Sequence, residues 1–82
     1  MAKRKSKCSV ALQDRTARLY DVAYDRRFSR DLAPGDKFDA AIAESTAHLA
    51  KRLARKGECA EARNAALSAV KILREIARRG RR

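Results

Sequence analysis

The chain has 82 residues and a net charge of +11, with 45 % hydrophobic and 38 % charged residues. A chain this short forms one domain at most and buries only a modest core. Alanine supplies 17 of the hydrophobic residues, whereas leucine, isoleucine and valine together supply 13. Because alanine favours helix but removes little area from water, the composition predicts thin, closely packed helices that a partner would stabilise further.

No apolar run approaches the roughly 20 residues of a membrane span, and no hydrophobic segment follows the basic N-terminus as in a signal peptide. We therefore expect a cytoplasmic protein that does not enter a membrane. Cys8 and Cys59 are the only cysteines. A reducing compartment disfavours a disulfide between them, so two free thiols are predicted.

The first helix is predicted within residues 9–32, with Ser9 as its N-cap and its end at about Phe28 or Leu32. Its expected core face is Leu12, Thr16, Leu19 and Ala23. The same helix carries Tyr20, Tyr24 and Phe28 one turn apart, among arginines. Such rings can stack on unpaired bases, but packing in the core or at an interface is the stronger explanation in a chain with four aromatic residues. We assign these three rings to a partner interface.

The segment Ala33-Pro34-Gly35-Asp36 should break the helix, because a residue before proline avoids the α region. The second helix is predicted over about residues 37–56, with Asp36 as N-cap and Asp39 at the capping-box position. Its expected buried stripe is Phe38, Ile42, Ser45, Leu49 and Leu53. Gly57 follows at the position where glycine commonly ends a helix.

Almost no connector remains before the third helix, predicted over about residues 58–79. Its expected core face is Cys59, Ala62, Ala66, Ala69, Val70, Leu73, Ile76 and Ala77. No segment alternates as a strand does. The sequence therefore predicts an all-α, three-helix domain over residues 9–79, in which the second and third helices form a tight antiparallel hairpin.

Part of this hairpin resembles a known repeat family. Apolar and small residues stand at the spacings of a tetratricopeptide-type hairpin: Leu49, Leu53, Gly57, Ala62, Ala66 and Ala69. The phrase GECAEARNAALSAVKIL resembles the second half of such a unit, and the match covers residues 46–72. Thr46 replaces the usual aromatic residue, and the closing proline is absent. One unit cannot bury both its faces, so the resemblance implies close hairpin geometry, by kinship or by convergence, and not a peptide-binding groove.

Most of the positive charge lies at the two ends of the chain. Residues 1–7 hold four basic residues, and residues 74–82 hold five arginines against Glu75. We treat residues 1–8 and 80–82 as basic tails that we expect to be flexible. Basic chain ends on a domain whose remaining positive and negative charges nearly cancel indicate a polyanionic partner, most often nucleic acid. Charge that serves only solubility is the alternative.

The third helix extends this charge along one side. At 100° per residue, Arg63, Lys71, Arg74, Arg78 and Arg81 fall within about 80° of one another. The predicted nucleic-acid-binding set adds Arg79, Arg82, Lys3, Arg4 and Lys5. Leu67 projects within the stripe and Ile72 beyond the core arc, so both are assigned to the partner interface.

Nothing in the chain indicates an active site, a metal or a cofactor. His48 is the only histidine, no CxxC spacing exists, and the three glycines are scattered. These features exclude a zinc site and a glycine-rich phosphate loop. Asp21 and Asp25 stand one turn apart, which is typical of a solvated helix face. A helix-turn-helix is also disfavoured, because the first turns of the second helix are acidic and would repel DNA.

The leading hypothesis is a non-enzymatic accessory protein that binds nucleic acid, DNA or RNA, or a nucleoprotein complex, mainly through charge. The alternative is a small helical interaction module, an adaptor or inhibitor, that docks on an acidic protein surface. A homo-oligomer that associates through the first helix is a third possibility.

Overall fold

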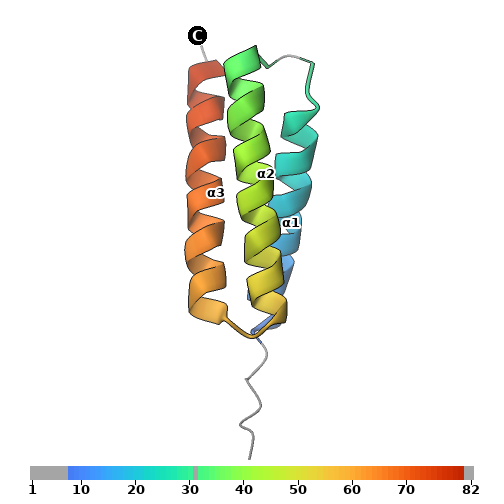
Figure 1. Cartoon of the computed structure of the whole chain (residues 1–82), viewed down its shortest axis with the longest axis vertical. Helices are drawn as coiled ribbons and strands as arrows, with labels where there is room; N and C mark the ends of the chain where they lie inside the picture. Colours follow the sequence, from blue (N-terminus) through green and yellow to red (C-terminus); the bar gives the residue numbers. More distant parts are fainter. Residues whose placement is uncertain (1–7, 31, 81–82) are drawn as a thin grey trace, which may run out of the picture.

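The computed structural model describes residues 8–30 and 32–80, which form three α-helices, the middle one antiparallel to the other two (Figure 1). These are α1 (Val10–Arg27), α2 (Pro34–Arg55) and α3 (Cys59–Gly80). The described residues contain no strand, so the predicted all-α, three-helix fold is confirmed. Within the same residues, no helix is long and apolar enough to cross a membrane.

α1 begins as predicted, with the Ser9 hydroxyl accepting a hydrogen bond from the Leu12 backbone N–H at 3.1 Å. The four residues expected to face the core are all buried. Thr16 is the buried polar member, and its hydroxyl donates to the Gln13 carbonyl at 2.9 Å. α1 ends at Arg27 with Phe28 as its C-cap, at the earlier of the two expected ends and not near Leu32, because the chain needs a connector to reverse direction before α2.

α2 begins earlier than predicted. Pro34 occupies the first turn and Ala33 precedes it in an extended conformation (φ −63°, ψ 154°). Proline suits this position because its fixed φ matches the helix and its missing N–H would have no partner there. Asp36 is therefore not the N-cap. It lies inside the first turn, where a carboxylate favours the helix dipole.

The predicted buried stripe of α2 is wrong except at Leu53, which is half-buried and packs against the Cys8 and Leu12 cluster. Phe38, Ile42 and Leu49 are 67 %, 41 % and 50 % exposed, and Ser45 is also exposed. The buried residues are Ala40, Ala43, Ala47, Ala50 and Ala54. The two stripes lie about 140° apart around the helix at 100° per residue. α2 packs against both other helices, and only its small side chains allow both to approach closely.

The larger side chains of the core come mainly from the two outer helices. Leu19 of α1 packs with the α2 alanines and with Ala66 and Ala69 of α3, and Val70, Ile72 and Leu73 cover this cluster. Ile76 is 1 % exposed. The predicted core face of α3 is therefore correct in its direction, with Ala62, Ala66, Ala69 and Ile76 fully buried.

The turn between α2 and α3 is as short as the sequence indicated. Gly57 has φ 82°, in the left-handed region that favours glycine. The Glu58 N–H donates to the Leu53 carbonyl at 2.9 Å, and the Gly57 N–H donates to the Ala54 carbonyl at 3.2 Å. This pair of hydrogen bonds is a Schellman motif. It caps α2 and turns the chain directly into α3.

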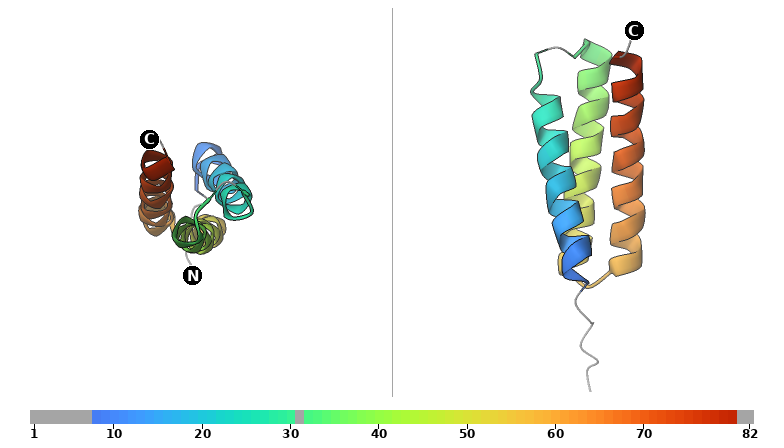
Figure 2. Two further views of the ribbon diagram at one scale, coloured as in Figure 1. Left: turned by 90° about the horizontal axis from the view of Figure 1, so that it is seen from above. Right: turned by 180° about the vertical axis from the view of Figure 1, so that it is seen from behind.

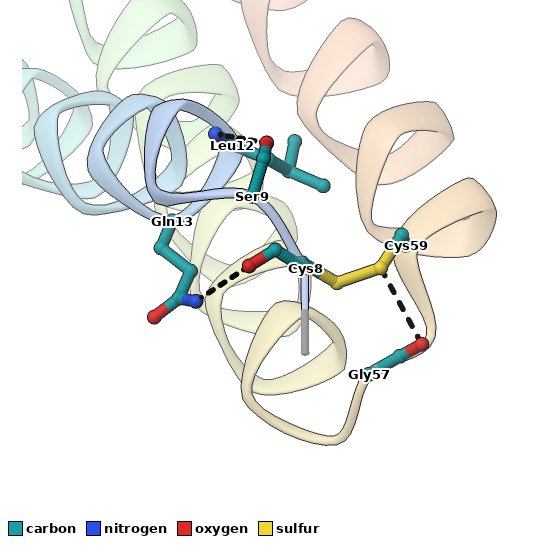
Figure 3. Close-up of a disulfide and its surroundings, with 6 residues drawn as sticks. All are labelled: Cys8, Ser9, Leu12, Gln13, Gly57 and Cys59. Atoms are coloured by element: carbon teal, nitrogen blue, oxygen red, sulfur yellow. Dashed lines mark hydrogen bonds between the residues drawn. A yellow bond between two sulfur atoms is a disulfide. The ribbon is translucent and has the colours of Figure 1, made fainter. Parts of the chain in front are cut away.

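A disulfide joins Cys8 to Cys59, with a Cα–Cα distance of 5.5 Å (Figure 3). The prediction of two free thiols is therefore wrong. It rested on an assumed redox compartment, whereas packing brings the start of α1 next to the start of α3. Gln13 Nε2 donates to the Cys8 carbonyl at 2.8 Å and holds this end of α1. The Cys59 Sγ lies 3.4 Å from the Gly57 carbonyl oxygen, but a bonded sulfur has no proton to donate.

Candidate nucleic-acid interface

The candidate site is the face that α1 and α3 form together. These two helices run in the same direction on either side of α2 (Figure 2), and they contact each other least. A groove of about 660 Å³ lies between them. We call it the α1–α3 groove. Its lining residues are Ala11, Leu12, Asp14, Arg15, Arg18, Leu19 and Val22 of α1, and Arg63, Ala66, Leu67, Val70 and Arg74 of α3.

Two of the predicted nucleic-acid-binding arginines, Arg63 and Arg74, belong to this groove. Lys71 is exposed on the same helix, outside the lining. Across the groove, α1 contributes Arg15 and Arg18. Within residues 8–30 and 32–80, no carboxylate lies within ion-pair distance of these five cations. Lys71 attracts the Glu75 carboxylate electrostatically, whereas the charge of the four arginines is available to an anionic partner.

Arg78 differs, because it forms an ion pair with Glu75 one turn earlier on α3. The hydrogen bond from Arg78, followed by its charge, lowers the pKa of the Glu75 carboxyl below its ordinary value. Both side chains are exposed, so solvent screens this pair and it adds little stability. Glu75 offsets part of the charge that Arg78 would present to a phosphate.

Arg79 forms ion pairs with two aspartates of α2. Its Nη2 lies 2.7 Å from an Asp39 oxygen and 3.1 Å from an Asp36 oxygen. The hydrogen bond with Asp39, more than any other cause, raises the pKa of the arginine further above its usual value. The two aspartates thus serve as partners for the last turn of α3, whereas the sequence had assigned them to capping. Arg79 joins the ends of α2 and α3 and is turned away from the groove.

The other predicted cations lie outside the described residues: Lys3, Arg4, Lys5, Arg81 and Arg82. The described chain begins at Cys8, at the end of the bundle where α3 starts, and α3 ends at the opposite end. The two basic segments of the sequence therefore join the bundle at opposite ends.

The five residues predicted as one partner interface are spread over the three different pairs of neighbouring helices. Tyr20 is half-buried against α2, with its ring 5.6 Å from the His48 ring and 5.2 Å from the Lys51 ammonium. Ile72 lines a small pocket with Ile42 and Arg79 between α2 and α3. Leu67 faces the α1–α3 groove. The structure therefore does not bring these residues together.

Tyr24 and Phe28 continue the aromatic row past Tyr20 and are exposed. Their ring centroids are 4.9 Å apart, and the Arg27 guanidinium lies 5.1 Å from the Phe28 centroid. Arg27 also donates to both Glu44 oxygens at 3.1 Å. The Phe28 end of this aromatic row is thus already in contact with Arg27, which Glu44 holds in place. It follows a different side of α1 from the groove arginines.

The sequence interpretation missed Arg15, Arg18 and Val22 as site residues. Their spacing placed them on one side of the first helix, but nothing in the sequence indicated which neighbour that side would meet. In the part of the chain that the structure describes, no cluster of His, Cys, Asp and Glu could hold a metal ion. Comparison with protein-family models, with curated proteins and with solved structures found no match for this chain.

Proposed function

We propose that this protein is a non-enzymatic accessory protein that binds nucleic acid, or a nucleoprotein complex, mainly through charge. One observation carries the proposal. Arg15, Arg18, Arg63, Lys71 and Arg74 lie on neighbouring helices with no carboxylate within ion-pair distance among residues 8–30 and 32–80. The residues from Arg63 to Arg74 span about 16 Å at 1.5 Å per residue, which corresponds to about five base-pair steps.

Binding of this kind neutralises phosphates and releases counterions, so it weakens steeply with salt. The test is fluorescence anisotropy of the full chain with labelled duplex DNA, single-stranded DNA and RNA of one length, over a range of ionic strengths. We expect binding at low salt, with a log–log slope of about −0.9 for each phosphate contacted on duplex DNA.

Charge-neutral variants then locate the face. Replacing Arg63, Lys71 and Arg74 by glutamine should weaken binding and reduce the slope by about 2 to 3. The matched control replaces Arg26, Arg30 and Lys37, which are exposed outside the groove. It removes the same charge and should change the slope less. Absence of binding at low salt, or binding that salt does not weaken, would contradict the proposal.

A cytoplasmic location is part of this proposal. Cytosolic thioredoxin and glutathione keep most thiols reduced, so the disulfide-bonded and the reduced forms are both relevant. The titrations are therefore run with and without reductant. The alternative function, docking on an acidic protein surface, is favoured by a separate feature, the apolar floor of the α1–α3 groove.

A further inference from the structure

The α1–α3 groove is an open seam of the bundle. α1 and α3 both pack along α2 (Figure 2) but contact each other least, and the groove lies between them. Counting from the bonded cysteines, Leu12 is level with Arg63, and Val22 is level with Leu73, the residue before Arg74. The lined region is therefore about 16 Å long at the standard helical rise, which is three helical turns.

The floor of this groove is apolar. Leu12 and Leu19 form its base and are nearly buried, while Val22 and Leu67 are 51 % and 59 % exposed. Val70 lies between the two helices. Large apolar side chains that gather in one trough mark a surface for a partner, whereas single exposed residues do not. A phosphate backbone leaves such a floor unused.

The rims of the groove are basic. Arg15 and Arg18 stand on α1, and Arg63 and Arg74 stand on α3, against one carboxylate, Asp14. A second copy of this chain would set these arginines against their own copies. The N-terminal segment of this chain is also basic, with four Lys and Arg in residues 1–7. Charge complementarity therefore selects an acidic occupant that comes from another molecule.

We propose that the α1–α3 groove binds an amphipathic acidic helix of a partner protein. Such a helix would lay its apolar side on Leu19, Val22 and Leu67 and place carboxylates beside the rim arginines. Helix-in-groove recognition of this kind needs anchors about one turn apart, which a three-turn groove accommodates. This binding goes beyond the proposed function and does not depend on it, because its energy comes largely from the apolar floor.

The test uses two labelled peptides of about 14 residues, or about four turns. One has leucines along one side and glutamates on both flanks, and the other has the same composition shuffled so that its leucines surround the helix. Anisotropy with the full chain should show the amphipathic peptide binding at least about tenfold more tightly. Equal binding of the two peptides would mean plain charge attraction and would overturn the proposal.

The deciding variant is Leu67→Ser, and its matched control is Leu49→Ser. Both leucines are exposed on long helices, but only Leu67 lines the groove. We expect Leu67→Ser to weaken peptide binding about fivefold or more, and Leu49→Ser to leave it unchanged. No difference between the two variants would overturn the proposal, and circular dichroism of both checks that the helices persist.

A labelled oligonucleotide measured in parallel separates the two ideas. If Leu67→Ser weakens oligonucleotide binding and neither peptide binds, the groove belongs to the nucleic-acid site and the helix proposal is wrong. If the amphipathic peptide binds as expected and no nucleic acid binds at low salt, the proposed function is wrong and the helix site stands.

Discussion

At the scale of single residues, the alanines of α2 control the packing. Ala40, Ala43, Ala47 and Ala50 are completely buried, and they alternate at spacings of three and four, as the inner positions of closely packed helices do. Each methyl group removes little area from water. These small side chains contribute mainly by letting both α1 and α3 approach α2 closely, so that Leu19 and Ile76 fill the space between the helices.

This arrangement predicts that enlarging a buried alanine of α2 costs more stability than removing one of its large, exposed side chains. Ala47→Leu adds volume where no space exists and should lower the free energy of unfolding by about 1–3 kcal/mol. Leu49→Ala removes a larger, exposed side chain and should change it by about 0.5 kcal/mol or less. Urea denaturation followed by circular dichroism measures both. A greater loss from Leu49→Ala would mean that the large apolar stripe is the buried one.

At the scale of secondary-structure elements, the disulfide compensates for the weakest contact in the bundle. α2 packs on both neighbours, whereas α1 and α3 touch little. The Cys8–Cys59 bond joins the residue before the N-cap of α1 to the first residue of α3, across a sequence separation of 51 residues. It thereby fixes the register of the groove walls.

Loss of this bond should destabilise the domain substantially. Closing a loop of this length reduces the entropy of the unfolded chain by an amount worth about 4 kcal/mol. Reduction, or the double substitution Cys8→Ser with Cys59→Ser, should therefore lower the midpoint of denaturation. Reductant should have no effect on the double variant, which is the control.

The bond itself is checked by thiol labelling. Alkylation of the native protein without reductant should modify neither cysteine, and alkylation after reduction should modify both. Rapid labelling of the unreduced protein, or equal stability of the oxidised and reduced forms, would contradict the role assigned to this bond.

At the scale of the whole molecule, the net positive charge destabilises the folded state but favours binding to a polyanion. With a charge of +11 on 82 residues, the basic side chains of the folded protein repel one another. Added salt screens this repulsion, so the melting temperature should rise with ionic strength. Binding to nucleic acid should fall over the same range, because counterion release becomes less favourable.

Thermal melts and anisotropy titrations in the same buffers measure the two trends. The variant without Arg63, Lys71 and Arg74 carries three fewer charges, so its melting temperature should rise less with salt. A melting temperature that falls with salt would show that ion pairs, such as those of Arg79 with Asp36 and Asp39, outweigh the repulsion.

Much of the fold was predictable because it depends on local order. Helical periodicity identified the buried faces of α1 and α3, Ser9 supplied the first cap, and Gly57 placed the turn. The face of α2 was not predictable in this way, since its sequence carries two stripes of similar spacing. Side-chain size favoured Phe38 and Leu49, but the choice depended on having neighbours on two sides.

The candidate site divides in the same manner. The basic stripe of α3 was visible because all its members lie on one helix. The contribution of Arg15 and Arg18 was not visible, because it depends on how α1 packs beside α3. Arg79 was assigned to nucleic acid, since its two aspartate partners are some 40 residues away in sequence and meet it only in the folded chain.

The sequence by itself determined the helices, their approximate ends, the hairpin turn and the excess of positive charge, because these follow from neighbouring residues and from composition. Only the tertiary structure decided which face of α2 is buried, that Cys8 and Cys59 meet, and that an apolar groove with arginine rims opens between α1 and α3. These features depend on contacts between segments that are distant in the chain. Their physical origin is the close packing that small side chains on the middle helix permit.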